Sequence, residues 1–174
     1  LHGFDMNNIA VVDLFNFTER SGGQAITVWP QGEGPHPGDV SHWGDQVLQS
    51  TWVPNDQNYT FLQEIVADIG ERYCIDQDRI FIAGFSMGAF FTNQIACDHA
   101  DLFRGFAPVA GGKPQSCANA QSAIMIQHGT ADDIVVLSSG EESRDFWLDQ
   151  NECGSSSTSS LNNCAFYDGC PDDK

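Results

Sequence analysis

Apolar residues along this chain form short continuous runs separated by stretches with helical spacing, a pattern that predicts strands alternating with helices. Three continuous runs are typical of buried parallel strands: residues 80–83, 105–110 and 123–126. A fourth, residues 25–29, also predicts a strand and ends at Pro30. Strands that alternate with helices in this way predict a mostly parallel sheet.

The helical stretches are equally clear. The best covers residues 59–73, where Phe61, Ile65, Ile69 and Tyr73 recur at every fourth position. Further helices are predicted over residues 6–20, after residue 86 and over residues 139–150. With 174 residues, the chain is long enough for one α/β domain that spans residues 1–174 and has helices on both faces of its sheet.

Residues 31–56 show no periodicity, which predicts a long surface loop. Trp43 and Trp52 lie in this stretch. Either tryptophan could form a wall of a substrate cleft, and either could simply pack beneath the loop.

The strongest candidate chemistry follows the apolar run 80–83. The pentapeptide Gly84-Phe85-Ser86-Met87-Gly88 has the G-x-S-x-G pattern and separates a predicted strand from a predicted helix. In that context a serine sits in a sharp turn with its hydroxyl exposed, and the helix N-terminus favours negative charge next to it. Ser86 is therefore predicted to be a nucleophile, and the two glycines are predicted to avoid collisions between strand and helix.

A second candidate lies beyond the run 123–126, in the sequence His128-Gly129-Thr130-Ala131-Asp132-Asp133. Carboxylates just past a strand end are where such sheets collect their site residues. Asp132 or Asp133 is predicted to be the acid of a catalytic triad, with Asp132 preferred.

Composition restricts the possible partners and the compartment. Seven Lys and Arg against 24 Asp and Glu give a net charge of −17, which argues against binding to nucleic acid or anionic membranes. Six cysteines without zinc-ligand spacing favour disulfides in an oxidising compartment, with a Cys74–Cys97 pair possible. The sequons at Asn16 and Asn58 agree with a secreted glycoprotein.

Several of these motifs resemble those of a known family. Residues 73–112, the segments Leu1-His2-Gly3 and Val28-Trp29-Pro30-Gln31-Gly32, and the His128–Asp132 motif closely resemble secreted feruloyl esterases, acetylxylan esterases and polyhydroxybutyrate depolymerases of the α/β-hydrolase superfamily. The resemblance implies Ser86 as nucleophile, Asp132 as acid, and the backbone N–H groups of Met87 and Phe4 as oxyanion donors. It implies neither a metal nor an organic cofactor.

The resemblance also implies a histidine base after Asp132, because the triad order in this fold is serine, acid, histidine. The five histidines are His2, His36, His42, His99 and His128, and all precede Asp132. His36 or His42 could substitute from the long loop. The simpler expectation is a fold incomplete at both ends, with the base and the first strands outside these residues and little activity in this span alone.

The sequence therefore predicts a secreted serine carboxylesterase, most similar to feruloyl esterases that act on plant cell-wall xylan esters. Acetylxylan esters and polyesters are alternative substrates, because fold does not decide between them. A relative that keeps the serine turn but only binds carbohydrate is the alternative from a different class.

Overall fold

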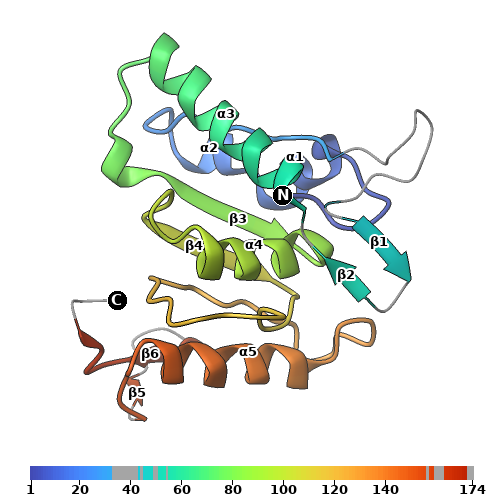
Figure 1. Cartoon of the computed structure of the whole chain (residues 1–174), viewed down its shortest axis with the longest axis vertical. Helices are drawn as coiled ribbons and strands as arrows, with labels where there is room; N and C mark the ends of the chain where they lie inside the picture. Colours follow the sequence, from blue (N-terminus) through green and yellow to red (C-terminus); the bar gives the residue numbers. More distant parts are fainter. Residues whose placement is uncertain are drawn as a thin grey trace.

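The computed structural model describes residues 1–32, 43, 55–155, 157–158 and 163–171, and the backbone of residues 45–48 and 51–53. Figure 1 shows a central group of strands with helices beside it, and places the N-terminus and C-terminus on different sides of this group.

Two parallel strands form the centre of the molecule. Strand β3 (Phe81–Phe85) pairs with β4 (Gly105–Val109) in a register that places Phe81 opposite Gly105 and Phe85 opposite Val109. The sequence prediction for both strands is confirmed. Both are apolar along their length, but β3 is buried mainly on one face: Ile82 and Gly84 are buried, whereas Phe81 is exposed.

Backbone segments extend this pair on both sides. The carbonyl of Leu1 accepts a hydrogen bond from the N–H of Phe85, at 3.1 Å, beyond the free edge of β3. On the other side, residues 123–127 run parallel to β4 through bridges at Ile124 and Gln127, so the predicted strand 123–126 is present as a short ladder. The spatial order is therefore the Leu1 segment, β3, β4 and then residues 123–127.

Three long helices surround this sheet. Helix α4 (Met87–Asp98) lies along β3 and β4, whereas α3 (Asp56–Arg72) and α5 (Leu137–Gln150) lie toward opposite sheet edges in Figure 1. All three helices are confirmed within a few residues of their predicted bounds. Helix α4 is buried along most of its length, including its polar residues Thr92, Asn93 and Gln94.

The predicted helix over residues 6–20 is divided in two. Helix α1 (Asn8–Phe15) and helix α2 (Phe17–Arg20) are separated by Asn16, which has a left-handed backbone with φ 49°. Such a residue interrupts the helical hydrogen bonding.

The predicted strand over residues 25–29 is wrong. This segment makes no backbone ladder with any described residue, and its contacts are individual ones, such as the side-chain amide of Asn8 donating to the Trp29 carbonyl. Alternating apolar residues are sufficient for an extended chain, but a strand requires a neighbour with which to pair.

The prediction of a structureless loop over residues 31–56 is also wrong in part. Strand β1 (Asp45–Leu48) and strand β2 (Thr51–Val53) form an antiparallel hairpin. Trp43, just before it, is fully buried against His2 and Phe91, with ring-centroid distances of 5.0 and 5.7 Å.

Two disulfides are present, and the Cys74–Cys97 pairing is wrong. Cys97 at the end of α4 bonds to Cys117, and Cys153 bonds to Cys170. Cys74 and Cys164 are free and exposed. The second disulfide lies next to the small pair of strands β5 (Ser157–Thr158) and β6 (Phe166–Tyr167). Within the described residues, no helix is both long and apolar enough to cross a membrane.

Candidate active site

Ser86 stands at the turn between β3 and α4 in a strained backbone conformation, with φ 53° and ψ −118°. A side-chain-bearing residue adopts positive φ only at a cost, and such residues concentrate at functional sites. Its N–H donates to the Val109 carbonyl at 2.9 Å, which fixes the turn to the end of β4. Its hydroxyl makes no hydrogen bond to any described residue and lies at the half-buried start of α4.

The glycines on either side of Ser86 are required by close backbone approach, as predicted. A Cβ on Gly84 would collide with the carbonyl group of Gly88 and lie 2.5 Å from the Thr92 hydroxyl. A Cβ on Gly88 would lie 2.6 Å from the carbonyl oxygens of Leu1 and His2. The two glycines therefore let strand, helix and N-terminal segment meet around one serine.

The N-terminal segment reaches this serine through Gly3. A Cβ built on Gly3 would lie 3.3 Å from the Cβ of Ser86. Phe4 follows directly, and its N–H makes no hydrogen bond to a described residue. The N–H of Met87, the first residue of α4, is likewise without a backbone partner among the described residues, as is normal at a helix start.

The ring of His2 holds the peptide between Gly3 and Phe4. Its Nε2 accepts a hydrogen bond from the Gly32 N–H at 2.8 Å, so Nδ1 carries the proton and donates to the Gly3 carbonyl, also at 2.8 Å. In a planar trans peptide the N–H points away from the carbonyl. Fixing the Gly3 carbonyl therefore also fixes the direction of the Phe4 N–H.

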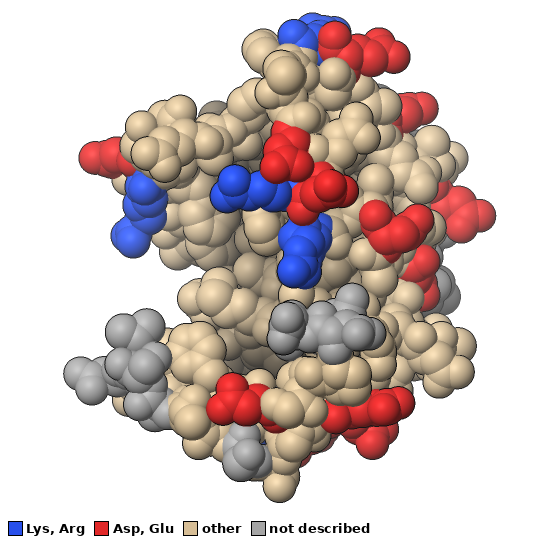
Figure 2. Space-filling view, turned by 90° about the vertical axis from the view of Figure 1, so that its left-hand side faces the viewer, with Lys and Arg blue, Asp and Glu red and all other residues tan. Residues whose placement is uncertain are grey.

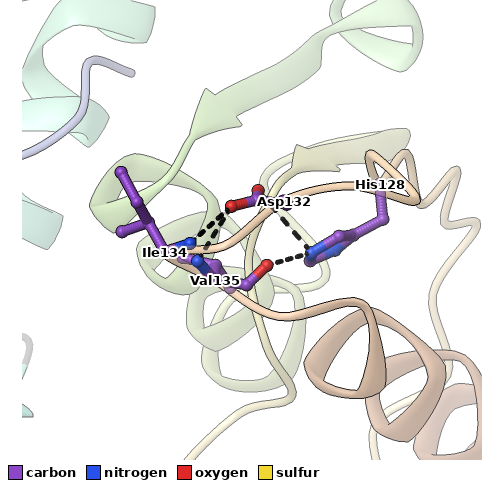
Figure 3. A network of polar contacts seen from close by, with 4 residues as sticks. All are labelled: His128, Asp132, Ile134 and Val135. Carbon is purple, nitrogen blue, oxygen red and sulfur yellow. Dashed lines mark hydrogen bonds and ion pairs between the residues drawn. The ribbon is translucent and has the colours of Figure 1, made fainter.

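Asp132 lies in the loop between residues 123–127 and α5. Its Oδ1 accepts hydrogen bonds from the N–H groups of Ile134 and Val135, both at 3.0 Å, as Figure 3 shows. Its Oδ2 receives no hydrogen bond from the described residues, and the residue is half-buried. Asp133, by contrast, is exposed and makes no such bonds.

Backbone pairing brings the Ser86 turn and the Asp132 loop together at the carboxyl ends of the strands. Val109 accepts from the N–H of Ser86 on one side and pairs with Gln127 on the other. His128 comes immediately after Gln127. The carboxyl ends of β3, β4 and residues 123–127 are therefore level, which is where parallel sheets place their site residues.

None of the described histidines occupies the position of a base. His2 is fully buried in the contacts given above, and the ring of His99 packs at a tilt against that of Tyr59, with a ring-centroid distance of 4.4 Å. His128 donates from Nε2 to the Val135 carbonyl at 2.6 Å. His36 and His42 lie outside the described residues.

Trp43 and Trp52 could each form a cleft wall or pack beneath the loop, and Trp43 does not reach the surface. It is fully buried, and its indole N–H donates to the His2 carbonyl at 3.1 Å, so it supports the N-terminal segment from within the core. The backbone of Trp52 belongs to β2, and its side chain lies outside the described residues.

At the amino ends of the strands, away from Ser86, lies a cavity of about 390 Å³, lined by residues that include Asp78, Arg104 and Ser122. Acidic and basic side chains stand side by side on this face in Figure 2. The cavity contains none of the predicted site residues. Within the described part of the chain, no three His, Cys, Asp or Glu side chains are arranged to hold a metal ion.

Sequence reasoning missed two contacts of this site: the ring of His2 on Gly3, and the ring of His128 on Val135. Both histidines belong to recognisable His-Gly pairs, so their positions could have been noted. Their partners could not, because the acceptor in each case is a backbone carbonyl, which every residue carries.

Comparison with known proteins agrees with this geometry. Residues 55–112 match the prolyl oligopeptidase family. The chain is 30% identical over 109 residues to feruloyl esterase D of Neurospora crassa, an alignment that covers 61% of this chain and 38% of that protein. It is 29% identical over 135 residues to a bifunctional acetylxylan esterase/xylanase of Neocallimastix patriciarum, covering 72% of this chain and 20% of that protein. The chain thus spans well under half the length of these relatives.

Among solved structures, the carboxylesterase of Bacillus cereus superimposes with a TM-score of 0.68 at 21% identity, covering 87% of this chain and 72% of that one. This similarity identifies the fold. Together with the strand, serine turn and helix described above, it shows that the chain has the α/β-hydrolase fold, and in sequence the chain is similar to feruloyl and acetylxylan esterases.

Proposed function

We propose that the protein containing this chain is a serine carboxylic-ester hydrolase and that residues 1–174 belong to its single catalytic domain. The observation that supports this most is the backbone of Ser86, held at φ 53° between β3 and α4 with Gly3 packed against it. Ser86 is the proposed nucleophile and Asp132 the proposed acid. The N–H groups of Met87 and Phe4 are the proposed oxyanion donors.

In the proposed reaction, the Ser86 hydroxyl loses its proton to an imidazole as Oγ bonds to the ester carbonyl carbon. The carbonyl oxygen becomes an oxyanion, and the two N–H groups stabilise it. The carbon–oxygen bond to the alcohol then breaks, and the imidazolium returns its proton to the leaving alkoxide. Water attacks the acyl-enzyme by the same steps and regenerates Ser86.

Asp132 is preferred to Asp133 as the acid because its Oδ1 is already fixed by two backbone N–H groups, whereas its Oδ2 remains available to an imidazole. The imidazole is not assigned to a described histidine, since His2 and His128 are committed to backbone groups. The activity proposed here is therefore that of the full-length protein.

The proposed substrate is a feruloyl ester of plant cell-wall xylan, which the similarity to feruloyl esterase D supports. Acetyl esters and polyesters are the alternatives within the same chemistry. Secretion is proposed with it, and the two disulfides agree with an oxidising compartment. Rates on feruloyl, acetyl and hydroxybutyrate esters, compared at equal enzyme concentration, distinguish these substrates.

A fluorophosphonate, which phosphonylates activated serines as fluoride leaves, tests the nucleophile directly in the full-length protein. We expect stoichiometric labelling that is lost in Ser86→Ala, together with a loss of kcat of at least about a thousandfold. Ser138→Ala, the same change at an exposed position of α5, is the matched control and should label normally.

The competing proposal is a relative that binds carbohydrate without catalysis. It predicts a folded full-length protein in which no serine is labelled and in which xylan still binds. Labelling that persists in Ser86→Ala would instead show that the reactive serine lies elsewhere, and would contradict the assignment of Ser86.

A further inference from the structure

His128 is buried next to the proposed acid without belonging to any proposed catalytic step. Its side chain is 5% exposed, against 21% for that of Asp132. It follows the last paired residue of the sheet, Gln127, and Figure 3 shows its ring facing the loop of residues 132–135.

The contacts of the ring show that Nε2 carries a proton, and they fix the orientation of the ring. Nε2 lies 2.6 Å from the Val135 carbonyl oxygen, which can only accept, so Nε2 carries the proton. Nδ1 is buried and has no hydrogen-bond partner among the described residues. The ring also rests against Gly140, where an added Cβ would collide with Nδ1 and lie 2.8 Å from Cγ. The imidazole is thus held between α5 and the loop.

Both the carbonyl and the N–H group of Val135 are therefore hydrogen-bonded. Its carbonyl accepts from His128, and its N–H donates to Oδ1 of Asp132 at 3.0 Å. The N–H of Ile134 donates to the same oxygen. The conformation of the loop between residues 132 and 135 is therefore fixed by hydrogen bonds to the ring of His128 and to Oδ1 of Asp132.

This arrangement leaves one carboxylate oxygen unused. Oδ2 of Asp132 lies 3.9 Å from Nε2 of His128, beyond hydrogen-bond distance, because the Nε2 proton is directed to the Val135 carbonyl. His128 therefore holds the loop without occupying the oxygen that a catalytic imidazole would need.

We propose that His128 is a positioning residue: by binding the Val135 carbonyl, it sets the backbone that orients Asp132 and keeps Oδ2 free for the catalytic imidazole. This inference rests on the proposed function, in which Asp132 is the acid. The effect is transmitted through Val135 and involves no contact with substrate.

The test compares two substitutions in the full-length protein. His128→Gln can keep an N–H donor near the position of Nε2, whereas His128→Phe fills the space without a donor. In His128→Phe we expect hydrogen exchange of the Ile134 and Val135 amides to accelerate about tenfold. The amide of Phe106, which donates to Ala123 within the sheet, is the internal control and should not change. His128→Gln should restore slow exchange.

Kinetics supply the second readout. We expect His128→Phe to lower kcat about tenfold or more with KM changed less than about twofold, and His128→Gln to recover most of the loss. Unchanged exchange at Ile134 and Val135 would overturn the proposal. Equal acceleration at Phe106 would also overturn it, because the effect would then be general destabilisation.

Asp132→Ala separates this inference from the function on which it rests. If Asp132→Ala lowers kcat and His128→Phe does not, the positioning role is wrong and the proposed function stands. If Asp132→Ala leaves kcat unchanged, the acid assignment is wrong and the positioning role falls with it. Loss of kcat in both substitutions, with rescue by His128→Gln, supports both.

Discussion

At the scale of single residues, the site depends on two glycines, which have no side chain to collide with their neighbours. Ser86 keeps an unfavourable backbone conformation, which costs about 1–3 kcal/mol and persists only where the surroundings enforce it. The surroundings here are Gly84 and Gly88, each in contact with backbone that no larger residue would tolerate. The strain is thus held by the packing of β3, α4 and the N-terminal segment.

Gly88→Ala is expected to lower the free energy of unfolding by about 1–3 kcal/mol, because its Cβ would press on the Leu1 and His2 carbonyls. Gly70→Ala is the matched control with the opposite sign. Gly70 lies inside α3, where a Cβ would make only ordinary contacts at 3.7 Å or more, so alanine should stabilise by about 0.5–1 kcal/mol. Urea denaturation of both variants measures the difference, and equal effects would contradict it.

At the scale of elements, apolar spacing predicted where the helices lie better than it predicted which of their residues are buried. In α3, Leu62 is buried and Ile65 packs against the core, but Phe61 and Tyr73, from the same predicted stripe, are 37% and 54% exposed. A helix period shows that one face is apolar. How much of that face is covered depends on what lies opposite, which spacing cannot supply.

Helices α3 and α4 are joined by the hydroxyl of Tyr59, which donates to the Asp98 carboxylate at 2.8 Å. Burial of the hydroxyl, and then its bond to Asp98, raise the pKa of Tyr59 above its ordinary value. A raised pKa means that the folded protein retains a proton that the unfolded chain loses above about pH 10. The stabilisation is therefore complete below about pH 10 and decreases as the pH rises further.

Tyr59→Phe should accordingly cost about 1 kcal/mol at neutral pH and progressively less above about pH 10. Free energies of unfolding of both proteins from pH 7 to pH 11 measure this. A difference that stays constant across the range, or grows with pH, would contradict a raised pKa of Tyr59 in the folded protein.

The errors at this scale concern which segments of the chain pair as strands. Residues 25–29 have a strand-like pattern but no backbone partner among the described residues, whereas residues 45–48 and 51–53 pair with each other although nothing in their spacing indicated it. Pairing is a relation between two segments, so the pattern of one segment alone does not determine it.

At the scale of the whole molecule, buried polar groups join the layers. The Oδ1 of Asn93 accepts from the indole of Trp147 at 2.8 Å and from the hydroxyl of Ser143 at 3.3 Å, and its Nδ2 donates to the Gly112 carbonyl at 2.9 Å. One side chain of α4 thus connects α5 and the loop after β4. Satisfied buried networks of this kind favour a unique packing arrangement.

The Cys97–Cys117 disulfide ties the end of α4 to the same loop across a sequence separation of 20 residues. Replacing both cysteines with alanine should lower the free energy of unfolding by about 3 kcal/mol, mainly because the unfolded chain gains freedom. Cys74→Ala removes an exposed free thiol and is the control, with little change expected. A loss below about 0.5 kcal/mol in the double variant would contradict this prediction.

The sequence by itself determined the strand–serine–helix unit, the need for glycine on both sides of Ser86, and the presence of Asp132 after a strand. These depend on local spacing and on the shape of individual residues. Only the tertiary structure decided that Trp43 belongs to the core, that Cys97 pairs with Cys117, and that His2 and His128 bind backbone carbonyls. Each of these depends on a partner distant in sequence or on a carbonyl common to all residues, so only the folded chain can specify it.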